Sequence, residues 1–197
     1  MHANEETARD GGKIARSDDE IARAFFAEAR RLLAEDYLPK IERCLEQLGD
    51  DIWWRPNEAS NSVGNLLLHL AGNARQWIVA GVGGAQDGRE RQTEFDAGKD
   101  AGAGGAELPT AQALLSRLRA TLAEVDAVLA RLEPASLLER RTIQGLSDVV
   151  VLNAVFHVVE HFSMHTGQIV QLTKMRAARD LRFYDFTSGA PRANWKE

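Results

Sequence analysis

The stretch from Val149 to Ala178, VVVLNAVFHVVEHFSMHTGQIVQLTKMRAA, decides the fold of this 197-residue chain. Its apolar residues recur at intervals of three and four, which predicts one long amphipathic helix that begins at Ser147-Asp148. Asn, His and Glu interrupt the apolar run well before the ~20 residues that a bilayer span requires. We therefore expect a core helix of a soluble protein with no membrane partner.

Three further segments carry the same helical periodicity. The first covers residues 17–48, and a kink or restart is expected at Leu38 because Pro39 lacks a backbone donor. The second covers residues 62–81 and the third residues 110–132. Four amphipathic helices, with no convincing run of alternating strands, predict an all-α fold, a four-helix bundle.

The remaining segments set the domain organisation. Residues 83–108 hold seven of the sixteen glycines and few large apolar side chains, so we expect a long mobile connection between the second and third helices. Residues 1–17 are polar and are expected to form a disordered tail. The bundle itself is placed at residues 18–180, and the four aromatic side chains of residues 181–197 predict a C-terminal extension that packs on it.

Composition and charge exclude several classes of function. Lysine and arginine number 24 against 29 aspartates and glutamates, and this net charge of -5 disfavours a nucleic-acid partner. Cys44 is the only cysteine, so no intrachain disulfide can form, and an inert buried thiol is expected there. The N-terminal residues have no apolar core of a secretory signal. We expect a cytoplasmic protein.

Three histidines follow one another along the quoted helix at intervals of four residues. His157, His161 and His165 therefore share one helix face, with about 5.4 Å between successive turns, and Val and Phe residues flank that face. A stack of imidazoles in apolar surroundings has few hydrogen-bond partners and must stay neutral. A divalent cation resolves this problem, because two histidines spaced by four can bind one ion.

A third ligand is expected from the second helix. His69 lies there in an apolar stretch, with Asn65 and Asn73 one turn away on either side of the same face. Bundle metal sites are built from side chains that project inward from facing helices. His69 together with His161 and His165 is therefore the predicted metal-ligating set.

Two segments together resemble the signature of the DinB/YfiT-like superfamily: NSVGNLLLHLAGNARQW, residues 61–77, and HVVEHFSMHTGQIVQL, residues 157–172. The resemblance covers the second and fourth helices. It implies a four-helix bundle with a long loop between helices two and three and a metal site formed by His69, His161 and His165. The family includes transferases and isomerases that act through low-molecular-weight thiols.

Three neutral imidazoles leave a divalent ion its full charge and at least one open coordination position, which is the pattern of catalytic sites. Such an ion activates bound water or a bound thiol, so hydrolysis and thiol-dependent transfer or isomerisation of a small molecule are both expected possibilities. The resemblance alone favours thiol chemistry with a low-molecular-weight thiol as co-substrate. Zinc or nickel is the expected metal, with iron and manganese as alternatives. The resemblance also implies a homodimer, and a non-catalytic metal-binding or stress-response module remains the alternative function.

A competing pattern overlaps the same helix. His157, Glu160 and His161 form the H-x-x-E-H sequence of inverted zinc peptidases, in which both histidines bind zinc and the glutamate acts as base. That hypothesis leaves His69 and His165 without a role. In the favoured one, five polar residues are candidates to contact the metal-binding histidines or to line the pocket beside them: His157, Glu160, Gln168, Asn65 and Asn73. Gly72 and Gly167 are expected where helix backbones approach closely.

Overall fold

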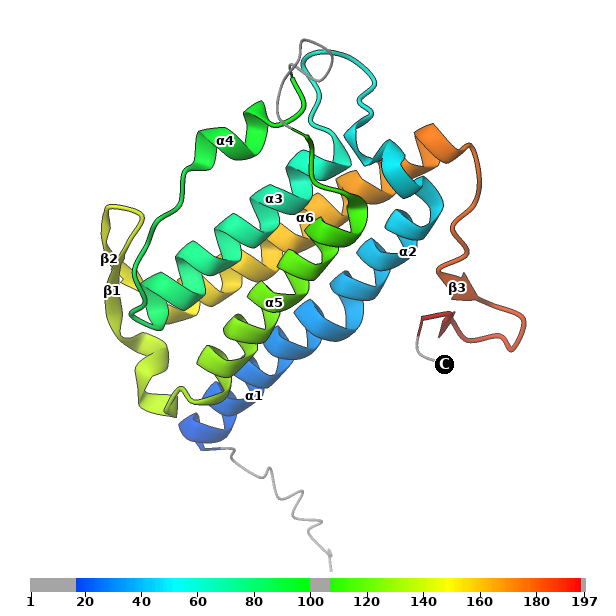
Figure 1. The fold of residues 1–197 in the computed structure, drawn as a ribbon. Helices are drawn as coiled ribbons and strands as arrows, with labels where there is room; N and C mark the ends of the chain where they lie inside the picture. The colour runs from blue at the N-terminus through cyan, green and yellow to red at the C-terminus, as the bar shows by residue number, and fades with distance from the viewer. Residues whose placement is uncertain (1–16, 100–106, 196–197) are drawn as a thin grey trace, which may run out of the picture.

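The structure, a computed structural model, describes residues 17–99 and 107–195 and consists mainly of four helical rods (Figure 1). The first rod joins α1 (Asp18–Arg31), a π-helical segment η1 (Leu32–Tyr37) and α2 (Leu38–Leu48). The π-helical segment ends at Tyr37 and α2 starts at Leu38, the residue before Pro39, where the missing backbone donor predicts a kink or restart. The short 3-10 helix η2 (Gly49–Trp53) follows.

The other rods confirm the predicted all-α bundle. The second rod is α3 (Val63–Ala74), continued by the π-helical η3 (Arg75–Val82). The third is α5 (Ala111–Ala130), followed by the 3-10 helix η4 (Pro134–Leu138), and the fourth is α6 (Val151–Ala177). Their starts follow from local sequence, because Ser62 and Thr110 accept backbone hydrogen bonds as N-caps of α3 and α5.

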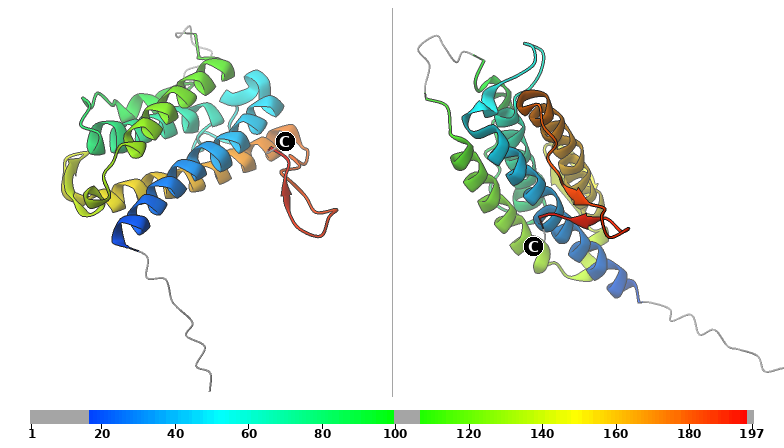
Figure 2. Two further views of the ribbon diagram at one scale, coloured as in Figure 1. Left: turned by 90° about the horizontal axis from the view of Figure 1, so that it is seen from below. Right: turned by 90° about the vertical axis from the view of Figure 1, so that its right-hand side faces the viewer.

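The first and last rods run in one direction and the two middle rods in the other. The first rod is antiparallel to α5, because Arg30 binds Asp126 while Arg119 binds Glu42. Likewise, α3 is antiparallel to α6, as the contacts described below show. Two middle rods that run in the same direction need a connection as long as the bundle, and the segment between Val82 and Ala111 provides it (Figures 1 and 2).

The second rod forms the centre of the molecule. All twelve residues of α3 are buried, including the polar Asn65, His69 and Asn73. Fully buried side chains from the other rods complete the core, among them Ile41, Leu118, Phe162 and Ile169. The other three rods leave one face of α3 free, so another segment of the chain must cover that face.

The connection after the second rod supplies this cover, so the expectation of a mobile connection is wrong for its described part. It contains a short helix α4 (Arg91–Asp96) that packs against α3. The side-chain amide of Asn65 donates to the backbone carbonyls of Glu94 and Ala97, at 2.9 and 2.8 Å. These bonds hold the segment on the bundle even though it is poor in large apolar residues; residues 100–106 lie outside the described range.

A β-hairpin precedes the last rod, where the sequence predicted an irregular link and a helix beginning at Ser147-Asp148. Strands β1 (Arg140–Ile143) and β2 (Leu146–Val150) pair antiparallel, and α6 begins only at Val151. The turn at Gln144 and Gly145 has positive φ at both residues, which suits the right-handed twist of a two-residue hairpin. The run of β-branched residues after this turn favours a strand over an early helix start.

The C-terminal segment lies along the outside of the first rod (Figure 2). Strands β3 (Tyr184–Asp185) and β4 (Arg192–Ala193) pair there, and the indole of Trp195 donates to the carbonyl of Glu35 at 2.8 Å. The expected N-terminal tail, apart from its last residue, lies outside the described residues. Within the described range, no helix combines the length and apolar character needed to cross a membrane.

Candidate metal centre

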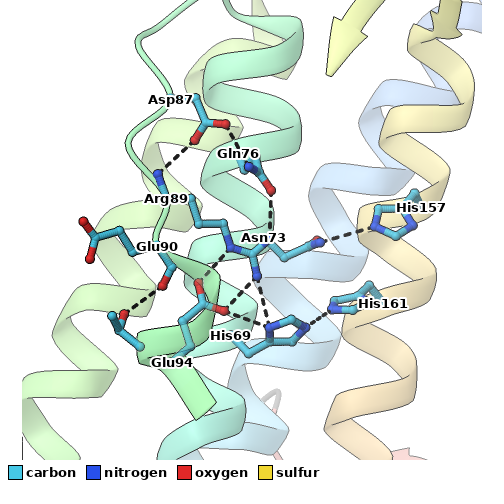
Figure 3. A network of polar contacts seen from close by, with 10 residues as sticks. His69, Asn73, Gln76, Asp87, Arg89, Glu90, Glu94, His157 and His161 are labelled. Carbon is cyan, nitrogen blue, oxygen red and sulfur yellow. Dashed lines mark hydrogen bonds and ion pairs between the residues drawn. The ribbon is translucent and has the colours of Figure 1, made fainter. Parts of the chain in front are cut away.

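Three histidines from two rods converge in the bundle. His69 comes from α3, and His161 and His165 come from successive turns of α6. One potential ligand atom from each lies within 4.8 Å of the other two, and the Nε2 atoms of His69 and His161 are 2.8 Å apart. Figure 3 shows the rings of His69 and His161 pointing toward one another. The structure thus brings together the three residues predicted as ligands.

The environment disfavours protonation of His161 and His165. His69 and His165 are buried, and His161 is partly buried. Burial lowers the pKa of His161 to about 3, and the neighbouring rings of His165 and His69 add to the effect. Burial also lowers the pKa of His165, although its hydrogen bond with Gln168 opposes the shift. Neutral imidazole is the form that binds metal ions.

In two of the three rings, Nδ1 lies within hydrogen-bond distance of a side-chain oxygen. The Nδ1 atom of His69 lies 2.9 Å from a carboxylate oxygen of Glu94, and Nδ1 of His165 lies 2.7 Å from the side-chain oxygen of Gln168. At His165 this acceptor places the proton of the neutral ring on Nδ1 and leaves the lone pair on Nε2. Nδ1 of His69 also lies 3.0 Å from Nη2 of Arg89. Metal-ligating histidines are oriented in the same way by carboxylate or carbonyl acceptors.

Glu94 itself is held by an arginine from the same connection. Arg89 binds both carboxylate oxygens of Glu94, at 2.7 and 2.8 Å, and both side chains are only 6% exposed. Burial acts against the charged carboxylate, but hydrogen bonds from Arg89 and His69 outweigh it, so the pKa of Glu94 is lowered. The carboxylate is therefore charged at neutral pH and can accept from His69.

The network continues outward from Arg89 (Figure 3). Its guanidinium donates to the side-chain oxygen of Gln76 at 3.0 Å, and the amide of Gln76 donates to Asp87 at 2.8 Å. Asp87 in turn accepts from the backbone N–H of Arg89 at 3.0 Å. This closed ring of contacts fixes residues 87–94 against the second rod, beside His69.

Gly72 makes room for the ion pair. A Cβ atom at this position would collide with Oε1 of Glu94 and Nε of Arg89. The expectation that helix backbones approach closely is thus wrong at Gly72, where the close neighbours are the side chains of an ion pair from the connection. It is also wrong at Gly167, where an added Cβ would meet nothing within 4 Å.

His157 lies one turn away from the three histidines and does not belong to the converging set. Its ring stacks on Trp77 with centroids 4.1 Å apart, and its Nε2 lies 3.3 Å from the side-chain amide of Asn73. Burial lowers the pKa of His157. Glu160 is exposed. The inverted-peptidase pattern requires His157 as a ligand, and the geometry does not support it.

The other pocket candidates have distinct positions. Asn65 forms a capping box with Ser62 and ties α4 to α3, so it acts on the site only through the connection. Asn73 faces His157, and in the described part of the chain its side-chain oxygen has no hydrogen-bond partner. Gln168 contacts His165 directly and lines a cavity of about 280 Å³ whose lining carries no charged side chain.

The sequence did not reveal Arg89 and Glu94 as site residues, because the glycine-rich segment around them predicted a mobile connection. Two features of that segment could have signalled them. Acidic and basic residues alternate over DGRERQTE, residues 87–94, and Phe95 is a large apolar residue in an otherwise polar stretch. In the structure the ring of Phe95 lies 4.7 Å from that of His69.

Comparison with known proteins places the chain in a family. A family profile described as "Protein of unknown function (DUF1572)" matches residues 20–189. The chain belongs to this DUF1572 family. A search of curated proteins found no match. A crystal structure described as a conserved protein from Enterococcus faecalis is similar to this DUF1572 protein, with 16% identity and a TM-score of 0.57. The match covers 84% of this chain and 100% of that one, and at this identity it shows a common fold alone.

Proposed function

We propose that this DUF1572 protein is a DinB/YfiT-like, metal-dependent enzyme in which His69, His161 and His165 bind one divalent cation, zinc or nickel. The observation that carries the proposal is the convergence of three potential ligand atoms within 4.8 Å of one another. The proposed reaction on a small molecule is transfer or isomerisation with a low-molecular-weight thiol, or else hydrolysis.

The residues fit such an ion. Ligand nitrogens around a tetrahedral zinc ion, each ~2.0 to 2.1 Å from it, are roughly 3.3 Å apart. The separation of 2.8 Å between the Nε2 atoms of His69 and His161 and the limit of 4.8 Å for the whole set bracket this value. Small side-chain rotations thus suffice to seat the ion. The contact of Gln168 supports this, because an acceptor at Nδ1 of His165 leaves its Nε2 unprotonated.

A divalent ion held by three imidazoles supplies a Lewis acid with open coordination positions for water or a thiol. The chain's own residues hold and orient it. Glu94 keeps the proton of His69 on Nδ1, and Arg89 keeps Glu94 charged. Gln168 holds His165 and lines the adjoining cavity, which carries no charged side chain, so this cavity suits an uncharged polar part of a substrate.

Elemental analysis of the purified protein tests the proposal. We expect one zinc or nickel ion per folded chain, and loss of that ion from a His69→Ala variant. A His157→Ala variant is the matched control, because it also removes a partly buried imidazole but leaves the set of three intact. Metal retained equally by the wild type and His69→Ala would overturn the proposed site.

An activity screen then separates an enzyme from a metal-binding module. The metal-loaded and chelator-treated proteins are compared in thiol-transfer assays and in hydrolase assays. Turnover that requires both the metal and His69 supports the proposed enzyme. A protein that binds metal through the three histidines but is inert in every assay would favour the non-catalytic module.

A further inference from the structure

A second cavity lies behind the ion pair that orients His69. It has a volume of about 540 Å³ and lies between residues 86–94, the second rod and α5. Its lining includes Gly72, Arg89 and Glu94 but none of the three converging histidines. The Arg89–Glu94 pair therefore forms the wall between this cavity and the candidate metal centre.

The inner wall of the cavity is a built structure rather than a surface irregularity. Arg89 and Glu94 are each 6% exposed, and Gln76 is 9% exposed. Each of these side chains is already engaged within the network described above. A buried and internally satisfied polar wall is pre-organised, so a ligand that docks on it need not reorder these side chains.

The outer part of the cavity carries charges that are not engaged in this way. Arg75 comes from the second rod, and its only ion-pair partner in the described chain is Glu124, at 3.8 Å with both side chains about half exposed. Such a pair contributes little. Arg117 from α5 and Glu90 from the connection also line the cavity, and neither has an ion-pair partner within the described residues.

These charges indicate which charged groups a ligand of this cavity should carry. Two guanidinium groups on neighbouring rods suit a carboxylate, because arginine recognises its two oxygens through paired hydrogen bonds. The carboxylate of Glu90 suits an ammonium group. The whole lining holds three arginines, at 75, 89 and 117, and three acidic residues, at 87, 90 and 94, so it is balanced in charge. A purely anionic or cationic ligand would leave this balance unmatched.

We infer that this cavity binds a small zwitterion of the amino-acid class, with its carboxylate at Arg75 and Arg117 and its ammonium group at Glu90. The cavity volume lies within the range of about 300–1,000 Å³ typical of small-molecule sites. The inference does not depend on the metal centre, because none of the three converging histidines lines the cavity.

Isothermal titration calorimetry of the full chain in the presence of a chelator tests the inference. The probes are the common amino acids, one at a time, together with succinate and butylamine as ligands of a single charge sign. We expect at least one amino acid to bind with one site per chain, and succinate and butylamine to bind at least about tenfold more weakly. Binding in metal-free protein separates this result from the outcome at the histidines.

Variants locate the binding site. Arg117→Ala and Glu90→Gln should each weaken amino-acid binding by about tenfold or more. Arg131→Ala is the matched control, since it removes an exposed arginine at the far end of the same helix and should leave binding unchanged. Both Arg117 and Glu90 are exposed, and thermal unfolding checks that their variants fold.

Three outcomes would overturn the inference. Absence of binding by every amino acid would show that the cavity has no such ligand. Binding of succinate as tight as that of an amino acid, with no effect of Glu90→Gln, would show a plain anion site. Amino-acid binding that Arg117→Ala and Glu90→Gln leave unchanged would place the site elsewhere.

Discussion

The Nε2 atoms of His69 and His161 lie 2.8 Å apart, although 92 positions separate the two residues in the chain. Two unprotonated imidazole nitrogens at this distance would direct their lone pairs at one another, so a proton or a cation must lie between them. In the metal-free protein one of these two ring nitrogens carries that proton. A divalent ion that replaces this proton would join both rings to His165.

Replacement of the third histidine distinguishes the two metal hypotheses. His165→Ala removes one of three ligands, so we expect zinc affinity to fall by at least about 100-fold. His157→Ala should change it by less than about threefold, because His157 lies outside the converging set. Competition with a fluorescent zinc chelator measures both. The reverse order, with His157 essential and His165 dispensable, would support the inverted-peptidase arrangement.

Glu94 is expected to raise the metal affinity of the site without contacting the metal. Glu94→Gln removes the charge that faces His69 and leaves the buried Arg89 without its carboxylate. We expect metal affinity to fall by about 10–100-fold, the usual effect of losing such an outer-shell partner. Glu90→Gln is the control, because Glu90 is exposed and lies outside the histidine contacts. Equal metal affinity in Glu94→Gln and wild type would contradict this role.

Gly72 on α3 and Gly167 on α6 form a matched pair of positions for substitution by alanine. Gly167→Ala meets open space, so the better helix propensity of alanine should raise stability by about 0.5–1 kcal/mol. Gly72→Ala must displace the Arg89–Glu94 pair, which offsets that gain and should weaken metal binding as well. Urea unfolding and chelator competition on both variants test this. A Gly72→Ala protein with unchanged metal affinity would show that the ion pair does not position His69.

Cys44 should be inert in the folded protein. Burial raises the pKa of its thiol to about 11, although Thr173 and Lys174 oppose the shift. At pH 8 we therefore expect reaction with a disulfide reagent to be slow, and fast only after unfolding in guanidinium. Because the folded pKa exceeds the unfolded one, the thiol's contribution to stability is complete below about pH 9 and is lost as the pH rises through 11. Rapid labelling of native protein would contradict this burial.

Local signals in the sequence explain what could be predicted. Helical periodicity, Pro39 and the caps at Ser62 and Thr110 are properties of short segments, so the four rods follow from them. The spacing of four between His161 and His165 places both on one helix face whatever the tertiary structure.

Non-local contacts explain what could not be predicted. Arg89 and Glu94 are buried through contacts with a distant helix, where Asn65 binds the backbone of their segment and Gly72 leaves room for their side chains. Nothing within the glycine-rich connection itself shows that these two side chains will be buried. The hairpin around Gln144 was likewise missed, because periodicity alone does not distinguish a strand from a helix in a short apolar run.

The most direct test of the central claim is a crystal structure of zinc-loaded protein with anomalous data collected at the zinc edge. We expect one anomalous peak between α3 and α6, bonded at about 2.0–2.1 Å to nitrogen atoms of His69, His161 and His165. A peak bonded to His157 and His161 without His69, or three rings that remain bonded only to protein atoms at saturating zinc, would contradict the account.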